Sequence, residues 1–421
     1  MNRWQSTELQ AHPDVSTVSQ SRGAGHSLYL LAGWPRLFLS SWLGARSMNL
    51  VHVEALCALE DPYQVGEHAD QLFDAAMREV TAYHQQHSPG YAEWLCQQQF
   101  DPSTLCSQAW GQLPPIFANY LKKHLLLSES GLDALELTSS GTTGQKSRMR
   151  YDTRSLGAAQ GMVDRIYRRY GWDTPQVPCN YLMLGYEPVG HSALGTAFTD
   201  NFLCKYAPVK QAFYALRHNG RQTEFDPFGV IEALQRFARD EAPLRILGFP
   251  AFMWFVLERM REMKVPPLAF AADSLAMFGG GWKTHADQQI PKAQLYARMN
   301  EQLGIPTSRC RDGYGSVEHC VPYVECENHR HHVPTYSRAF TRHTGTFALQ
   351  GYGQPGLIQF VSPYITSSPA HSIVMSDLAV LHRGDECGCG IATDWFEILG
   401  RAGTGKSRSC ALAASELIRE N

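Results

Sequence analysis

A segment rich in serine, threonine and glycine carries the residue types that bind a polyphosphate. Between Leu137 and Arg148 it contains two glycines, six hydroxyl side chains and two cations. Glycine allows the backbone to approach a phosphate closely, hydroxyl groups donate to phosphate oxygens, and Lys146 supplies positive charge. The same composition is common in polar turns. The functional interpretation predicts an ATP-binding loop with the contact residues Ser139, Ser140, Gly141, Thr142, Thr143 and Gly144.

Four further segments follow in an order that suits one nucleotide site. The first comes after a predicted strand and would let a flat base lie against the backbone, because it consists of Gly279, Gly280 and Gly281. The second is a tight turn that begins at Asp312. In this turn Tyr314 would stack on adenine beside Gly315, and Glu318 would hold Mg²⁺ next to the phosphates.

The last two segments contain one carboxylate and one cation. Asp377 stands at a predicted strand end, where its oxygens would accept hydrogen bonds from both ribose hydroxyls. Gly400 and Arg401 follow the last predicted strand. Taken alone, each segment has a plainer interpretation, because Tyr-Gly turns are common and an isolated Asp is usually solvated or caps a helix. Five segments in this order favour one shared nucleotide site.

These five segments resemble the motifs of the adenylate-forming enzymes. The resemblance is strongest to the acyl-protein synthetases of bacterial luminescence systems, together with their phenylacetate-CoA ligase and coenzyme F390 synthetase relatives. It extends from Asn49 to the end of the chain, and Gly-Gly-Gly-Trp-Lys at 279 to 283 is its most family-specific part. It implies that Asp377 binds ribose and that Arg401 lies at the ribose and hinge position.

The resemblance also implies a reaction. A carboxylic acid, expected to be a fatty acid, would attack the α-phosphate of ATP and give an acyl-adenylate and pyrophosphate. Mg²⁺ would be required, and Lys146 and Glu318 would be catalytic. Positioning and charge neutralisation dominate catalysis of this kind. Because a carboxylate is already ionised at neutral pH, this step requires no general base.

The C-terminal tail indicates where the acyl group would go next. Full-length acyl-CoA ligases carry a long mobile domain beyond the position of Arg401, whereas a short tail follows it here. This tail resembles the acyl-protein synthetase terminus, whose cysteine accepts the acyl group as a thioester, and Cys410 is the corresponding residue. Lys406 and Arg408 would favour its thiolate form. The alternative is a buried structural cysteine.

The expected partner is an acyl reductase that receives the acyl group, and other functions stay open. The chain could be an acyl-CoA or carrier-protein ligase, or a ligase similar to coenzyme F390 synthetase that forms an amide or ester. It could also be an inactive homologue that acts as a scaffold for the reductase. The ligase interpretations all release AMP and pyrophosphate, so only the scaffold would lack activity.

A cluster of cysteines and histidines predicts a structural zinc site. Two short segments supply Cys and His residues in numbers that suit tetrahedral Zn²⁺. Similar elements occur in the phenylacetate-CoA-ligase-like group, and this resemblance makes the preferred ligands Cys326, His332, Cys387 and Cys389. His329 and His331 are alternatives for the histidine position. Reduced thiols beside solvated histidines are the alternative to a metal.

The composition is that of an ordinary soluble globular protein. Of the 421 residues, 44% are hydrophobic and 18% are charged, and the net charge of -3 predicts no nucleic-acid footprint. Eleven scattered cysteines, an odd number, indicate reduced thiols and therefore a cytoplasmic protein. The apolar run from Leu28 to Leu43 is too short to cross a bilayer, so no membrane span is expected.

The resemblance implies that the elements positioning these residues form an α/β adenylate-forming fold. We expect a poorly ordered N-terminal extension (1–47), an acyl-adenylating domain (48–399) and a short acyl-acceptor tail (400–421). Within the domain, a helical lead-in would come first (48–135). The phosphate loop and α/β core (136–320) would follow, and then a zinc-binding, β-rich part (321–399).

Hydrophobic runs give the individual elements. In the core, short strand-like runs alternate with helical ones, which predicts an α/β sheet; these runs are Tyr181–Leu184, Phe228–Phe237, Leu244–Gly248, Phe252–Met263 and Leu275–Phe278. Beyond Gly345 the pattern changes to successive strands separated by turn residues, at Leu357–Val361, Ile373–Met375, Ala379–Leu381 and Trp395–Leu399.

Overall fold

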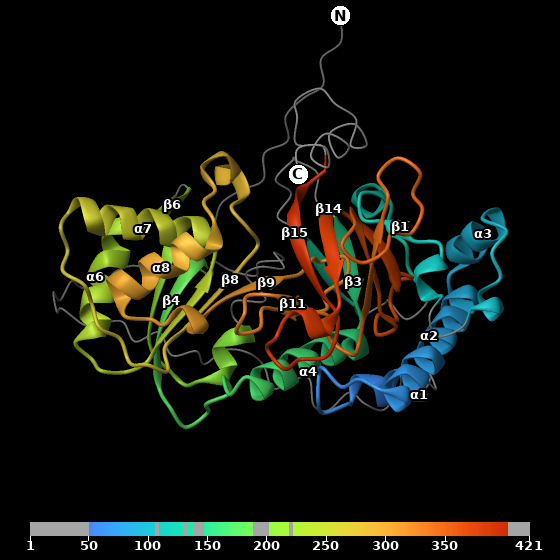
Figure 1. The fold of residues 1–421 in the computed structure, drawn as a ribbon, viewed down its shortest axis with the longest axis horizontal. Helices are drawn as coiled ribbons and strands as arrows, with labels where there is room; N and C mark the ends of the chain where they lie inside the picture. Colours follow the sequence, from blue (N-terminus) through green and yellow to red (C-terminus); the bar gives the residue numbers. More distant parts are fainter. Residues whose placement is uncertain are drawn as a thin grey trace, which may run out of the picture. The chain divides into compact units, whose positions relative to one another are not determined.

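The computed structural model of the chain describes residues 50–105, 109–128, 134–138, 147–187, 202–218 and 222–402 (Figure 1). The predicted N-terminal extension, the predicted phosphate loop from 139 to 146 and the tail from 403 onward lie outside this part of the chain. Two large sheets, one two-stranded hairpin and the surrounding helices make up the described residues. The α/β class predicted from the sequence is therefore confirmed.

The larger sheet has seven strands in the order β10-β9-β8-β7-β4-β5-β6. Its central strands are parallel, and β6 and β10 are antiparallel at the edges. Along β4, Leu182 and Leu184 enter one hydrophobic core, and Tyr181 and Met183 enter another. Both faces must therefore be covered, as parallel sheets require. The strands are β4 (Cys179–Tyr186), β5 (Val209–His218), β6 (Thr223–Phe225), β7 (Leu244–Gly248), β8 (Leu275–Gly279), β9 (Cys310–Tyr314) and β10 (Tyr323–Val324).

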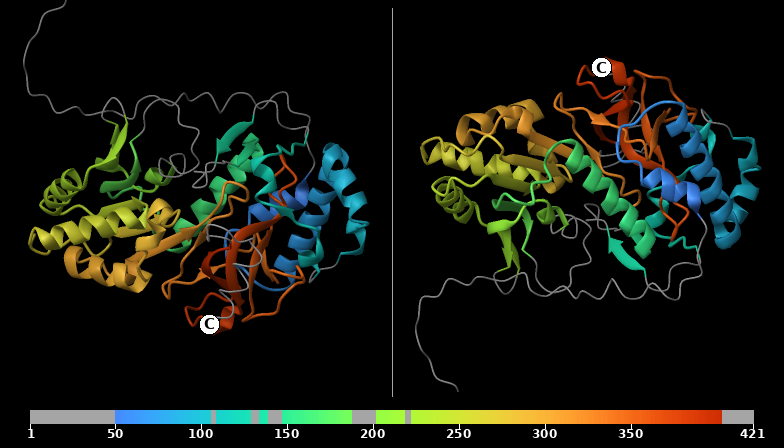
Figure 2. Two further views of the ribbon diagram at one scale, coloured as in Figure 1. Left: turned by 90° about the horizontal axis from the view of Figure 1, so that it is seen from above. Right: turned by 90° about the horizontal axis from the view of Figure 1, so that it is seen from below.

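Helices cover the two faces of this sheet (Figures 1 and 2). One core is completed by α6 (Pro227–Ala238), α7 (Pro250–Glu262) and α8 (Lys292–Leu303), and the other receives side chains from α4 (Thr153–Arg169). The sequence fixes where α6 begins, because the Asp226 side chain accepts a hydrogen bond from the Gly229 amide at 2.8 Å and proline occupies the first turn.

The second sheet has six strands in the order β11-β15-β14-β13-β12, with β1 paired in parallel to β14. Helices α1 (Val51–Cys57), α2 (Glu67–His87) and α3 (Pro89–Gln97) lie beside it (Figures 1 and 2). His84 Nε2 lies 3.0 Å from the carbonyl oxygen of Ile365, and the Tyr91 hydroxyl lies 2.9 Å from His371 Nε2. The strands are β1 (Ile116–Phe117), β11 (His331–His332), β12 (Arg338–Arg342), β13 (Pro355–Val361), β14 (Ser372–His382) and β15 (Trp395–Arg401).

The predicted alternation of strands and helices in the core is confirmed. Strands β4, β7 and β8 and helices α6 and α7 occupy the five predicted runs, with ends that differ by a few residues. In the C-terminal part, Leu357–Val361 and Trp395–Leu399 lie in β13 and β15. The described residues between 50 and 135 begin with three helices and also contribute β1 to the second sheet.

One prediction about the C-terminal strands is wrong. Ile373–Met375 and Ala379–Leu381 are parts of the single strand β14, and Asp377 lies inside that strand and not at its end. Ser376 and Asp377 have turn-like side chains, but here both side chains have hydrogen-bond partners. Asn119 Nδ2 donates to Ser376 Oγ at 2.9 Å, and Tyr314 donates to Asp377. Strand β14 continues through this point without a turn, and its register with β15 shifts between Leu378 and Ala379.

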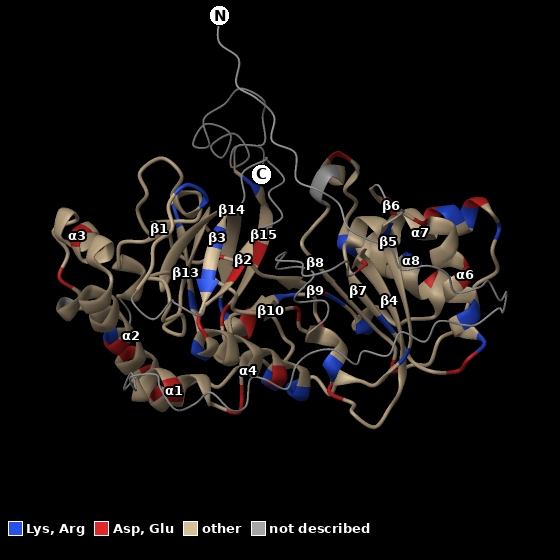
Figure 3. Cartoon of the chain, turned by 180° about the vertical axis from the view of Figure 1, so that it is seen from behind, with Lys and Arg blue, Asp and Glu red and all other residues tan. Residues whose placement is uncertain are grey.

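Charges of both signs are interspersed on the helices of the described residues, for example on α6 and α7 (Figure 3). Several of these charges form ion pairs within one helix, as Arg259 does with Glu262 at 2.9 Å and Arg261 with Glu258 at 2.6 Å. Within the same part of the chain, none of the helices combines the length and the apolar character that a bilayer crossing demands.

The substitution of Gly248 tests the packing at the end of β7, and the substitution of Gly157 in α4 is the comparison. Gly248 has a φ of 122°, and a Cβ added there would lie 2.7 Å from the carbonyl oxygen of Leu184. We expect Gly248→Ala to lower the free energy of unfolding by more than about 1 kcal/mol. Gly157 in α4 has open space around its Cα, so Gly157→Ala should raise it by about 0.5–1 kcal/mol. Urea denaturation of both variants measures this difference, and equal effects would contradict the packing described.

Candidate functional site

The three-glycine segment and the predicted adenine turn lie next to each other. Strands β8 and β9 are parallel neighbours, and Gly279 is paired with Gly313. After β8 the chain continues through Gly280 and Gly281, whose φ values of 73° and 66° favour glycine. Because the carboxyl ends of parallel strands meet at the same edge of a sheet, the glycines adjoin the turn that begins at Tyr314.

Tyr314 links the two sheets. It ends β9 of the seven-stranded sheet, and its hydroxyl donates to Asp377 Oδ2, on β14 of the other sheet, at 2.9 Å. Its ring lies against Phe360 and Phe396, with ring centroids 5.7 and 5.5 Å apart. Burial raises the pKa of Tyr314 well above its usual range, and the negative charge of Asp377 is the second largest cause. The hydroxyl therefore remains a hydrogen-bond donor at every physiological pH.

Asp377 and Arg401 face each other across β14 and β15. The two residues are paired in the antiparallel register, and Arg401 Nε lies 3.5 Å from Asp377 Oδ1. Tyr314 binds the other carboxylate oxygen. A carboxylate offers about four acceptor positions, so Asp377 keeps acceptor capacity for ribose hydroxyls beyond these two contacts. Tyr314, Asp377 and Arg401 are widely separated in sequence, and the structure brings them together as one cluster.

Glu318 is buried in the turn after Tyr314, with 6% of the residue exposed. The turn is anchored one residue earlier, where the Val317 carbonyl accepts a hydrogen bond from the Tyr151 hydroxyl at 2.6 Å. Tyr151 belongs to β3 (Arg148–Tyr151), which pairs with β2 (Leu135–Thr138). Since Thr138 is opposite Arg148, the two strands that flank the predicted phosphate loop lie side by side, and one of them is attached to the turn of Glu318.

Of the predicted nucleotide contacts on described residues, Tyr314, Asp377 and Arg401 form one cluster, and Gly279 pairs with Gly313 on the neighbouring strand. Gly280 and Gly281 follow β8, and Gly315 and Glu318 follow β9. The other predicted contacts lie outside the described residues, and these are Ser139, Ser140, Gly141, Thr142, Thr143, Gly144, Lys146 and the predicted acyl acceptor Cys410. Mg²⁺ commonly takes one or two carboxylates and completes its shell with phosphates and water, so the single carboxylate of Glu318 fits it.

The four preferred zinc ligands converge. One donor atom from each lies within 4.8 Å of the donor atoms of the other three, although two segments distant in sequence supply them. Cys326 Sγ is 3.5 Å from Cys387 Sγ, and Cys389 Sγ is 3.3 Å from His332 Nε2. Bond lengths of about 2.3 Å to sulfur and about 2.0 Å to nitrogen around one tetrahedral ion require separations of this size.

The surroundings of these four side chains also suit a metal. His332 Nδ1 lies 2.7 Å from the carbonyl oxygen of Thr393, so this nitrogen carries the proton and Nε2 is left to bind a metal. Burial raises the pKa of the Cys326 thiol to about 12, and a divalent cation would compensate the cost of forming a thiolate there. We propose that Cys326, His332, Cys387 and Cys389 hold a structural Zn²⁺.

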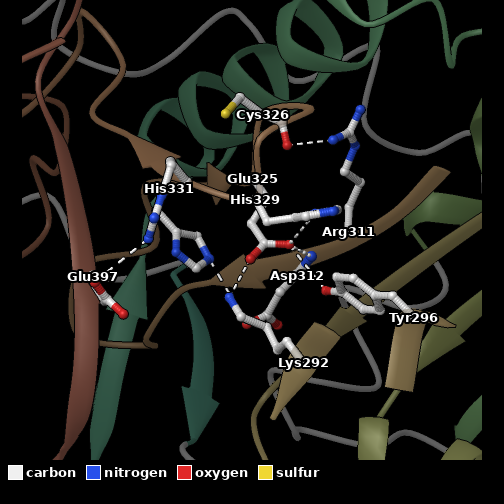
Figure 4. A network of polar contacts seen from close by, with 10 residues as sticks. Lys292, Tyr296, Arg311, Asp312, Glu325, Cys326, His329, His331 and Glu397 are labelled. Carbon is white, nitrogen blue, oxygen red and sulfur yellow. Dashed lines mark hydrogen bonds and ion pairs between the residues drawn. The ribbon is translucent and has the colours of Figure 1, made fainter. Parts of the chain in front are cut away.

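The two alternative histidines lie in a different cluster (Figure 4). His329 Nδ1 is 3.6 Å from Glu325 Oε2, and His331 Nε2 is 3.9 Å from Asp312 Oδ2. Lys292 forms an ion pair with Glu325. Burial and the Glu325 carboxylate together raise the pKa of Asp312 to about 7. His329 and His331 thus lie apart from the four proposed zinc ligands. Those four residues, Cys326, His332, Cys387 and Cys389, are called the four-residue centre below.

The sequence patterns do not reveal this second cluster. Asp312 begins the predicted turn of Tyr314, and Lys292 and Glu325 lie in none of the predicted motifs. One sequence signal was available, because Glu325 is a charged residue directly between Val324 of a buried strand and the predicted ligand Cys326. A carboxylate at such a position must be paired when it is buried.

Comparison with known proteins identifies the family. The sequence matches the model of the family described as "Acyl-protein synthetase, LuxE" over residues 48–418. The chain belongs to this family. A relative, the long-chain-fatty-acid–luciferin-component ligase of Vibrio harveyi, is 24% identical over 309 residues, which are 72% of this chain and 77% of the relative.

Solved structures confirm the adenylate-forming fold. An open conformation of 2-hydroxyisobutyryl-CoA ligase in complex with 2-HIB-AMP and CoA has a TM-score of 0.57 and 15% identity, covering 80% of this chain and 70% of that one. The same ligase in the thioesterification state also has a TM-score of 0.57 and 15% identity, covering 81% and 69%. The family match over residues 48–418 confirms the predicted resemblance to the luminescence-type acyl-protein synthetases. This LuxE-family protein is an ATP-dependent acid ligase that activates a carboxylic acid.

The zinc proposal predicts a defined metal content. The purified protein should contain about one zinc per chain, and His332→Ala and Cys389→Ser should each remove most of it and lower the melting temperature, because a structural zinc contributes folding free energy. Cys96→Ser is the matched control, since Cys96 is exposed and lies on α3. Elemental analysis by mass spectrometry measures the content. Zinc-free protein after purification without chelators would exclude the metal.

Proposed function

We propose that the protein activates a long-chain fatty acid as its acyl-adenylate, transfers the acyl group to Cys410 and passes it to a partner protein. The observation that carries this proposal is the cluster of Tyr314, Asp377 and Arg401 beside the three glycines, in a chain whose family match reaches residue 418 and so includes Cys410. The chemistry named for the Vibrio harveyi relative supports a long-chain fatty acid as the substrate.

The proposed first step joins a carboxylate oxygen of the acid to the α-phosphorus of ATP and releases pyrophosphate. Tyr314 and the three glycines would position adenine, and Asp377 would bind the ribose. Glu318 would hold Mg²⁺, which supplies positive charge to the phosphates when bound. Lys146 and the hydroxyls of the loop would bind the transferring phosphate oxygens.

The proposed second step moves the acyl group to sulfur. The Cys410 thiolate would attack the acyl carbonyl carbon, a thioester bond would form, and AMP would leave with the electron pair of the broken carbon–oxygen bond. The acyl group would then pass to a partner, for which an acyl reductase is our first candidate. Direct ligation to coenzyme A or to a carrier protein is the competing function, since the fold neighbour binds CoA.

Glu318 provides a test of the first step. We expect Glu318→Gln to lower acid-dependent pyrophosphate release by about 100-fold or more, because the amide would bind Mg²⁺ poorly. The substitution preserves side-chain size, so the melting temperature should change little. Glu93→Gln on the exposed surface of α3 is the matched control and should be fully active. Measurement with a panel of straight-chain acids also gives the preferred chain length, and unchanged release in the Glu318 variant would refute its role.

Cys410 provides a test of the second step. With ATP and a fatty acid, the native protein should gain the mass of one acyl group in an adduct that hydroxylamine removes. Cys410→Ala should abolish the adduct while pyrophosphate release continues for at least the first turnover, because adenylation does not use the thiol. Cys96→Ala is the control and should still be acylated. An acylated Cys410→Ala protein, or acyl-CoA formed without any adduct, would contradict the proposed transfer.

A further inference from the structure

Glu325 binds the main chain of the strand that leads into the nucleotide turn. Its side chain is fully buried, and Oε2 accepts hydrogen bonds from the Asp312 amide at 2.8 Å and from the Tyr296 hydroxyl at 3.0 Å. Its own amide donates to the Asp312 carbonyl at 3.0 Å. Glu325 therefore holds Asp312 through both its main chain and its side chain (Figure 4), and Tyr314 is two residues further along the same strand.

The same carboxylate is charged and paired. Lys292, at the start of α8, forms an ion pair with Glu325 Oε1 and lies 3.7 Å from Asp312 Oδ2. The Lys292 side chain is 45% exposed, so it could turn toward water if Glu325 were removed. The pair therefore fixes Glu325 in place without burying both partners.

Glu325 directly precedes Cys326, the first residue of the four-residue centre. The carbonyl of Cys326 accepts a hydrogen bond from the guanidinium of Arg311, which directly precedes Asp312. Two consecutive residues of β9, Arg311 and Asp312, are thus bound to Cys326 and Glu325. Glu325 and Cys326 begin the segment between β10 and β11 (325–330), called the metal loop below. A displacement of the loop would move both anchoring points of β9 just before Tyr314.

We propose that Glu325 is a positioning residue, through which the metal loop sets the position of Tyr314 and with it the affinity for ATP. This inference rests on the proposed function of Tyr314 as the adenine contact. Stacking on adenine is the same in the ground state and in the transition state, so displacement of Tyr314 should weaken nucleotide binding and leave the turnover rate at saturating ATP almost unchanged.

Three variants test the proposal, with a nonhydrolysable ATP analogue as the probe. Glu325→Leu removes the acceptor of the Asp312 amide, and the Kd should rise about tenfold or more. The double variant Lys292→Met, Glu325→Gln removes both charges but keeps an oxygen in place, so its Kd should stay within about threefold of the native value. Glu327→Gln is the matched control, because Glu327 is exposed in the same loop, and it should bind normally.

Calorimetry gives the Kd, and pyrophosphate release gives kcat and KM. An unchanged Kd in a folded, zinc-containing Glu325→Leu protein would overturn the proposal, and so would a double variant impaired as strongly as Glu325→Leu. If Glu325→Leu does not fold, Glu325→Asp replaces it. The shorter side chain keeps the charge but withdraws the acceptor, so the same rise in Kd is expected, and a native Kd would overturn the proposal.

A second arm tests the connection to the metal loop. Chelation of the metal should raise the Kd of the native protein and have little further effect in Glu325→Leu, because both changes act through one contact. Additive effects would show that the loop does not act through Glu325. Binding of the analogue requires no acid, so these results are independent of whether fatty acids are activated. A native protein that binds the analogue but releases no pyrophosphate would contradict only the proposed function.

Discussion

The hydrogen bond from Tyr314 to Asp377 joins the two sheets at the proposed nucleotide site. Neither sheet alone carries all of the proposed nucleotide contacts. The glycines and Tyr314 belong to the seven-stranded sheet, whereas Asp377 and Arg401 belong to the six-stranded sheet. A site divided in this way depends on how accurately the two sheets are held together, because contacts from both sheets must reach one nucleotide at the same time.

The parallel core could be predicted from sequence because its physical cause is local. Strands such as β7 and β8 are buried on both faces and read as short continuous apolar runs, and α6 and α7 show helical spacing between them. The nucleotide residues were predicted by type, since glycines, an aromatic ring and carboxylates each have a defined use beside a nucleotide. Their convergence in space could not be derived from the residues alone, because it depends on the pairing of β8 with β9 and of β14 with β15.

The errors and omissions have a common physical reason. Ser376 and Asp377 look like turn residues until their partners Asn119 and Tyr314 are known, and both partners are distant in sequence. The apolar neighbours of Glu325 indicate that it is buried, but the sequence does not show that it lies opposite Asp312. In each case a polar residue is stabilised inside a sheet by a contact that only the tertiary structure creates. Patterns of hydrophobicity carry no information about such pairs.

The four proposed zinc ligands, Cys326, His332, Cys387 and Cys389, come from both of these sheets. Cys326 follows β10 of the seven-stranded sheet, while His332 lies in β11 and Cys387 and Cys389 lie between β14 and β15 of the other sheet. The sheets also meet at Tyr323 of β10, whose hydroxyl lies 2.7 Å from Ser337 Oγ and whose ring packs against Phe360 and Phe396. A metal bound by ligands from both sheets would add a further constraint, because a tetrahedral ion fixes the positions of all four donors. A structural ion at this place would therefore contribute to nucleotide affinity without touching the nucleotide.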